Sequence, residues 1–165
     1  MRPTHRLDLI LVSNTVERHP DAAAFADVCA AWRAAGRLVG DGPGEGTPLV
    51  DGGFRRLWLD LPARVTLYAN HQGGYYVRCP ITQGNLAREF SVAVEQWRAG
   101  EPRTLACPHC GQIHPLEEVR MAPPGAFGRG AVIFSDVGSM GLGPGVEAAL
   151  MPVLGECQAI GRRVG

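Results

Sequence analysis

The chain opens with a short apolar run followed by a segment of helical periodicity. Residues 7–12 are apolar but for Asp8, and Ser13-Asn14 ends the run, so a strand is predicted there. Pro20 and Asp21 then favour a helix start, and Gly36 ends a stretch to about residue 35. Its apolar side chains recur at helical spacing, namely Phe25, Val28, Cys29 and Trp32. The first third therefore predicts strand followed by helix, with Cys29 as a packed thiol.

The middle of the chain alternates between short strand patterns and one helix. Residues 56–61 alternate apolar and polar, which predicts a strand that completes the first unit. Residues 65–68 and 75–78 predict a hairpin, with Gln72-Gly73-Gly74 in the turn. Residues 86–99 have helical spacing and end at Gly100.

The last third repeats the order of the first. Residues 131–134 predict a strand, 146–154 a short helix and 159–164 a terminal strand. Two strand–helix–strand units predict an α+β fold with ferredoxin-like βαβ…βαβ order. We expect residues 1–165 to form a single domain, in which the halves 1–62 and 126–165 flank an inserted segment, residues 66–120.

Composition narrows the possible functions. The 16 basic residues are all Arg and are balanced by 16 acidic residues, so no uniformly charged nucleic-acid or membrane surface is implied. The absence of Lys excludes Schiff-base chemistry on Lys and a Walker-type phosphate site. No apolar window is long enough for a transmembrane helix, and five irregularly spaced cysteines favour a cytoplasmic protein with reduced thiols.

The strongest chemical signal is the motif Cys107-Pro108-His109-Cys110-Gly111. A two-residue spacer lets both sulfurs face one metal, Pro stiffens the entry to the turn, and Gly permits the tight turn after the second Cys. These residues resemble the knuckles of zinc-ribbon proteins. The resemblance implies a zinc-ribbon-like element in the inserted segment, with zinc as its cofactor.

A second, incomplete knuckle precedes it. Cys79-Pro80-Ile81-Thr82 has the same form, but Thr82 stands where a second Cys is expected. Three cysteines need a fourth ligand, and we rank His71 on the preceding strand pair ahead of His114, with His109 pointing away from the metal. The predicted metal ligands are therefore Cys79, Cys107, Cys110 and His71, with His114 as the alternative.

Three other interpretations of the cysteines stay open at this stage. The site is a metal-free relic, or a redox Cys-X-X-Cys, or a catalytic zinc site. The redox interpretation needs a helix after the first Cys, which Gly111 and Pro115 disfavour. The catalytic one needs an open coordination position and an acid or base such as Glu117 or Glu118.

Two further motifs offer weaker functional hypotheses. The glycine-rich residues 135–145 resemble a nucleotide loop, although too little chain follows for such a fold. Tyr75-Tyr76 beside Arg78 has the residue types that stack on bases, but one of two adjacent strand residues normally faces the core. We expect a small binding or adaptor protein that recognises a protein partner first and nucleic acid second; the alternative is an enzyme using a groove near the ribbon or the 135–145 loop.

Overall fold

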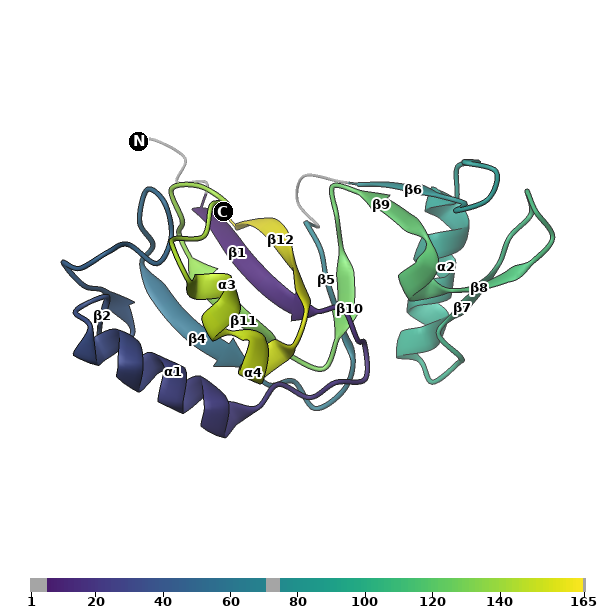
Figure 1. The fold of residues 1–165 in the computed structure, drawn as a ribbon. Coiled ribbons are helices and arrows are strands. Elements are labelled where there is room, and N and C mark those ends of the chain that lie inside the picture. The colour runs from purple at the N-terminus through teal and green to yellow at the C-terminus, as the bar shows by residue number, and fades with distance from the viewer. Residues whose placement is uncertain (1–5, 71–74, 165) are drawn as a thin grey trace.

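A four-stranded antiparallel sheet forms the centre of the larger part of the molecule (Figure 1). The computed structural model describes residues 6–70 and 75–164. The strands are arranged in the order β12 (Cys157–Val164), β1 (Arg6–Ser13), β11 (Ala131–Ser135) and β4 (Arg56–Asp60), and each neighbouring pair is antiparallel. The fold is therefore mixed α and β, as the sequence predicts.

The strand order interleaves the two ends of the chain. β1 and β4 run parallel on either side of β11, while β11 and β12 run parallel on either side of β1. Helix α1 (Ala22–Ala34) lies in the connection from β1 to β4, after the Asp21 carboxylate accepts a 2.9 Å hydrogen bond from the Ala24 N–H. The predicted helix over residues 146–154 is two short ones, α3 (Val146–Ala149) and α4 (Met151–Leu154).

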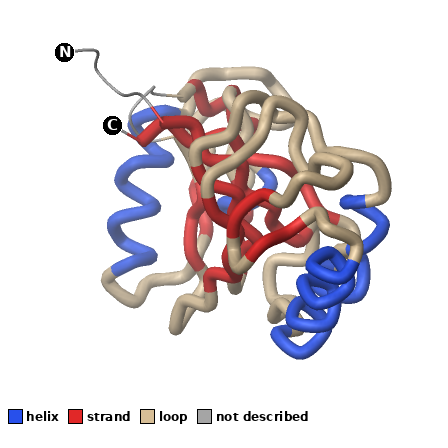
Figure 2. Tube along the Cα trace, turned by 90° about the vertical axis from the view of Figure 1, so that its left-hand side faces the viewer, coloured by secondary structure: helices blue, strands red, loops and turns tan. Residues whose placement is uncertain are grey.

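Both faces of the sheet are buried, which explains why β1 is almost continuously apolar. Leu9 and Leu11 pack on the helical side with Trp32, whereas Ile10 and Val12 pack on the opposite side with Tyr68. The opposite side includes the pair β5 (Thr66–Tyr68) and β10 (Ala126–Gly128). Figure 2 shows the resulting arrangement, with strands through the middle of the molecule and helices on the outside.

A second hydrophobic core lies between a small lobe, residues 75–122, and the pair β5 and β10, which contribute Leu67 and Phe127. The small lobe contains α2 (Ala87–Arg98), and its two strand pairs are β6 (Tyr76–Arg78) with β9 (Arg120–Ala122), and β7 (Thr104–Ala106) with β8 (Ile113–Pro115). The turn η1 (Leu116–Glu118) follows β8. Phe90 is fully buried at the centre of this core, and Val77, Leu86 and Leu116 pack around it.

The predicted hairpin of residues 65–68 and 75–78 is wrong. β5 pairs with β10 and β6 pairs with β9, so each strand takes a partner from much later in the chain. The physical reason is that β5 lies between two cores, with Tyr68 in the core of the four-stranded sheet and Leu67 in the core around Phe90, whereas the buried side chain of β6, Val77, enters the core around Phe90. The expected turn residues 72–74 lie outside the described residues.

The glycine-rich residues 135–145 pack tightly against another loop. A Cβ on Gly138 would overlap the backbone of Gly52, and the Ser139 hydroxyl donates a 2.7 Å hydrogen bond to the Asp51 carbonyl. Nearby, β2 (Leu38–Val39) and β3 (Gly42–Pro43) form a short hairpin after α1. The glycine at position 138 is thus explained by close packing of two backbones.

Ion pairs connect the small lobe to the loop after β1. The Arg103 side chain contacts Glu117 at 3.2 Å and Glu17 at 3.4 Å, and Glu17 also pairs with Arg129 at 2.6 Å. The Arg103 guanidinium lies 5.9 Å from the centre of the Trp97 ring. Over the described residues, no helix combines the length and the apolar character needed to cross a membrane.

Candidate metal centre

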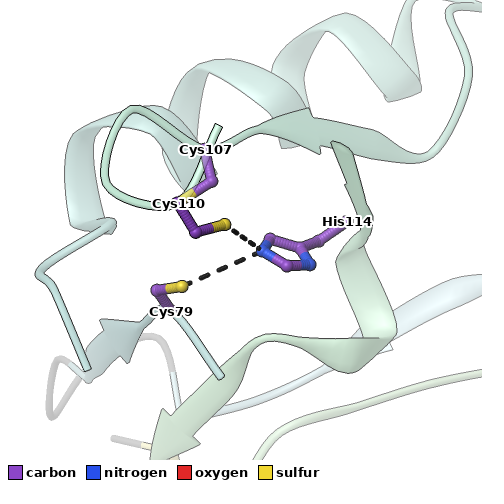
Figure 3. A group of neighbouring side chains, drawn as sticks. All are labelled: Cys79, Cys107, Cys110 and His114. Carbon is purple, nitrogen blue, oxygen red and sulfur yellow. Dashed lines mark hydrogen bonds between the residues drawn. The ribbon is translucent and has the colours of Figure 1, made fainter. Parts of the chain in front are cut away.

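Three cysteines and one histidine converge in the small lobe (Figure 3). Cys79 directly follows β6, Cys107 directly follows β7, Cys110 lies in the turn between β7 and β8, and His114 lies within β8. Their possible ligand atoms all lie within 4.8 Å of one another. Segments separated by the whole of α2 therefore meet at one point.

The distances suit a single tetrahedral ion. The His114 Nε2 atom lies 3.1 Å from the Cys110 Sγ and 3.8 Å from the Cys79 Sγ. Zinc–sulfur and zinc–nitrogen bond lengths place a sulfur and a nitrogen ligand about 3.6 Å apart in a tetrahedral site. Cys79 and His114 are 0% and 4% exposed, and Figure 3 shows the imidazole pointing toward the sulfurs.

The two cysteine turns have the same backbone hydrogen bonds. In the first, the Cys79 N–H donates to the Gly84 carbonyl at 2.8 Å and the Gln83 N–H donates to the Cys79 carbonyl at 3.0 Å. In the second, the corresponding bonds join Cys107 with Gln112 at 2.9 Å and Gly111 with Cys107 at 3.0 Å.

The left-handed residue also falls at the same place in each turn. Gln83 has φ of 65° and Gly111 has φ of 74°, each four residues after the leading Cys. Thr82 therefore stands in the first turn where Cys110 stands in the second. The first turn keeps the backbone of a knuckle but supplies one thiol instead of two.

Hydrogen bonds concentrate on the Cys79 sulfur. The backbone N–H groups of Ile81 and Thr82 both donate to it at 3.4 Å. Burial raises the pKa of this thiol, but the Thr82 hydroxyl, the two N–H groups and the Cys107 thiol act against burial and lower the pKa to about 5. Cys79 is thus favoured as a thiolate, the form that binds a metal.

The pKa of Cys110 is shifted in the opposite direction. The Gln112 N–H lowers its pKa, but burial and the neighbouring Cys107 and Cys79 sulfurs together raise the pKa above the ordinary value. A cluster in which one thiol ionises easily and its neighbour resists ionisation has the like-charge crowding that a cation relieves. This electrostatic pattern follows from the same close approach of the sulfur atoms.

His109 joins the two turns from outside the cluster. Its Nε2 lies 2.9 Å from the Asn85 carbonyl oxygen, and because a carbonyl only accepts, the Nε2–H is the donor. Its ring lies against Gly84, where a Cβ would come within 2.5 Å of the ring carbons. His109 therefore holds the second turn against the first, and it is not a member of the cluster.

The structure brings together three of the four ligands expected from the sequence. Cys79, Cys107 and Cys110 meet, and the fourth member of the cluster is the alternative, His114. His71 lies outside the described residues, so the structure does not test it. Strand alternation in the sequence would place the apolar Ile113 inward, but in the structure Ile113 is 71% exposed and His114 is 4% exposed, so the pattern alone does not identify His114.

Comparison with known proteins gave no relative: no family model, curated protein or solved structure matches the chain. All five cysteines are free thiols in the structure.

Proposed function

We propose that the chain is a small binding protein whose Cys79, Cys107, Cys110 and His114 side chains hold a structural zinc ion. The observation that carries this proposal is the convergence of four ligand atoms within 4.8 Å, all in the small lobe. Cys79 and Cys107 also pack in the core around Phe90, but a metal ion would account for the direction of the buried His114 ring toward the sulfur atoms.

The donor set favours zinc. Three thiolates and one imidazole are soft-to-borderline ligands, and zinc takes four such ligands in structural sites. Oxygen-preferring ions such as calcium and magnesium need carboxylates and carbonyls instead. The Cys79 and Cys110 sulfurs also accept N–H hydrogen bonds from the backbone, an outer shell that orients thiolate ligands.

The same arrangement favours a structural role for the ion. Four protein ligands leave no open coordination position for a substrate or water. The small lobe has two strand pairs of only three residues per strand, which are marginal without further support. An ion bound by Cys79, Cys107 and His114 would join β6, β7 and β8 in one crosslink.

The enzyme alternatives receive less support from the same residues. Gly111 is left-handed and leads into β8, so no helix begins at Cys107 as a redox Cys-X-X-Cys requires. Glu117, one of the two candidate acids or bases near the cluster, forms an ion pair with Arg103. The glycine-rich loop at 135–145 is packed on the 48–53 loop.

The strand order supports a ferredoxin-like fold for the four-stranded sheet and its helices. The parallel strands β1 and β4 of the first unit lie on either side of β11, and the parallel strands β11 and β12 of the second unit lie on either side of β1. This is the split βαβ arrangement, so we propose a ferredoxin-like fold. Residues 66–120 would be an insertion between the halves 1–62 and 126–165 of a single domain. Free thiols and a thiolate zinc site also fit a reducing, cytoplasmic location.

The test is zinc stoichiometry of the purified full-length chain, alongside Cys79→Ser, Cys107→Ser and His114→Ala. We expect about one zinc per chain in the wild type and a loss in each variant. Cys29→Ser and Cys157→Ser are matched controls, since both thiols lie outside the cluster and should leave zinc bound. His71→Ala separates the two candidate fourth ligands. A wild type that folds without metal would make the cluster a relic and overturn the proposal.

A further inference from the structure

The outer face of the β6–β9 pair is exposed and carries an unusual combination of side chains. In this register Tyr76 lies opposite Ala122 and Arg78 lies opposite Arg120. All four side chains point away from the small-lobe core, because the residues between them, Val77 and Met121, pack into it. The four residues Tyr76, Arg78, Arg120 and Ala122 are called the β6–β9 face.

The two arginines of this face oppose one another directly. Cβ atoms of such pairs lie about 5 Å apart, and like charges in this position destabilise a strand pair. Within the described residues, neither Arg78 nor Arg120 has a carboxylate within ion-pair distance. Two arginines on one strand pair without a neutralising carboxylate are complementary to an anion, and phosphate fits the forked donors of a guanidinium best.

The metal centre fixes one of the two arginines. Arg78 directly precedes Cys79, and its Nη1 donates a 3.2 Å hydrogen bond to the carbonyl of Gln83 in the first turn. That bond takes one of the five N–H donors, so the others stay free for a ligand. The orientation of Arg78 thus rests on the turn led by Cys79, and so on the proposed zinc site.

Tyr76 gives the face its second property. It is 70% exposed, while its neighbour Tyr75 packs edge-to-face on Phe90. Ala122 opposite has no long side chain to cover the ring. Residues two apart on a strand are separated by about 6.6 Å along the backbone, which is close to the spacing of successive nucleotides in an extended single strand.

We propose that the β6–β9 face binds single-stranded nucleic acid, with a base stacked on Tyr76 and neighbouring phosphates held by Arg78 and Arg120. Paired bases inside a duplex do not expose the ring face that stacking needs. An acidic protein would satisfy the arginines but would leave Tyr76 without a planar partner, and for this reason the structure favours nucleic acid over the protein partner expected from the sequence.

The test is fluorescence anisotropy of the zinc-loaded, full-length chain with labelled oligothymidylate and oligouridylate at low salt. Because the chain carries no net charge, we expect modest affinity, with Kd between about 1 and 100 µM. Two phosphate contacts predict a slope of log K against log salt of about −1.4. Comparing the two oligonucleotides decides between DNA and RNA, and an unlabelled duplex should compete poorly.

Variants of the face separate stacking from charge. Tyr76→Ala should weaken binding about tenfold or more, and Tyr76→Phe should retain it. Arg78→Gln and Arg120→Gln should each reduce the salt slope to about −0.7. Arg98→Gln removes an exposed arginine on α2 and should change neither the binding affinity nor the salt slope.

Several results would overturn the proposal. These are no binding at about 100 µM protein, equal binding of duplex, equal binding by Tyr76→Ala, and stronger binding of polyglutamate or polyphosphate than of the oligonucleotides. Zinc content measured on every variant keeps the two proposals apart. A zinc-loaded chain that does not bind refutes this inference alone, whereas a chain without zinc refutes the proposed function.

Discussion

The Nε2–H of His109 donates a 2.9 Å hydrogen bond to the carbonyl oxygen of Asn85, and this contact joins the two cysteine turns. His109 lies between Cys107 and Cys110, while Asn85 follows the turn led by Cys79. The hydrogen bond and the ring contact with Gly84 bring the two halves of the site together through the protein itself. The protein itself therefore organises part of the candidate metal centre.

Gly84→Ala tests this contact. The added Cβ would lie 2.5 Å from the His109 ring, which the Asn85 carbonyl holds in place, so one of the two turns must shift. Overpacking of this kind costs about 1–3 kcal/mol of unfolding free energy. Urea denaturation of the zinc-loaded variant measures the loss.

Gly42→Ala is the matched control for that variant. A Cβ on Gly42 would meet its nearest atom, the Arg55 carbonyl oxygen, at 3.4 Å, an ordinary contact. Its effect should stay within about 0.5 kcal/mol. Equal stability of the two variants would show that the His109 ring does not hold the turns together.

Removing the metal should open the small lobe and leave the four-stranded sheet folded. The core around Phe90 is built mostly from the lobe and is shared with Leu67 and Phe127, whereas Ile10 and Leu11 lie in the two cores on the faces of the four-stranded sheet. After treatment with a strong chelator, we expect amide hydrogen exchange to accelerate in residues 77–116 and to stay slow in β1. Equal acceleration in both regions, or no acceleration in either, would contradict the structural role of the ion.

Thr82 offers a rescue experiment. Because Thr82 occupies the position in the first turn that Cys110 occupies in the second, a thiol at 82 should face the ion. His114→Ala should lose zinc, and the double variant Thr82→Cys/His114→Ala should regain it with four sulfur ligands. Failure of the double variant to regain zinc, with the chain still folded, would argue against the equivalence of the two turns.

Glu17 makes the attachment of the small lobe sensitive to acid. Hydrogen bonds and charge from Arg129 and Arg103 outweigh a raising effect of burial, and they hold the Glu17 pKa below its ordinary value of 4.5. A carboxyl with a depressed folded-state pKa contributes stability above its unfolded pKa and loses it as pH falls through the folded pKa.

Wild type should therefore melt at a higher temperature than Glu17→Gln at pH 7, and the difference should shrink below pH 4.5. Glu17 is 58% exposed, so the difference should be small and should also decrease with added salt. Glu45→Gln, an exposed carboxylate without an ion pair in the described residues, is the control. A difference that grows in acid would contradict the assigned network.

The elements with strong periodicity could be predicted from sequence. The α1 helix follows from the spacing of Cys29 and Trp32 and from its Asp21 cap, and β1 and β11 follow from their apolar runs. The partners of β5 and β6 could not be predicted. Each strand has only three residues, and its partner lies far along the chain, β10 for β5 and β9 for β6, so no local pattern specifies the pairing.

In the candidate site, too, the local features could be predicted from the sequence and the non-local ones could not. The sulfurs follow from local spacing, because a two-residue spacer and a left-handed residue are features of one turn. The choice between histidines depends on how β8 folds back on β7, which places His114 opposite Leu105 with its ring inward. Such a non-local contact leaves little trace in a single sequence.

The most direct test of the zinc proposal is X-ray absorption at the zinc edge of the purified wild-type chain. We predict three sulfur atoms at about 2.3 Å and one nitrogen atom at about 2.0 Å from the metal. The imidazole contribution should disappear in His114→Ala and persist in His71→Ala. A shell of oxygen and nitrogen atoms with fewer than three sulfurs, or the absence of bound zinc, would contradict the account.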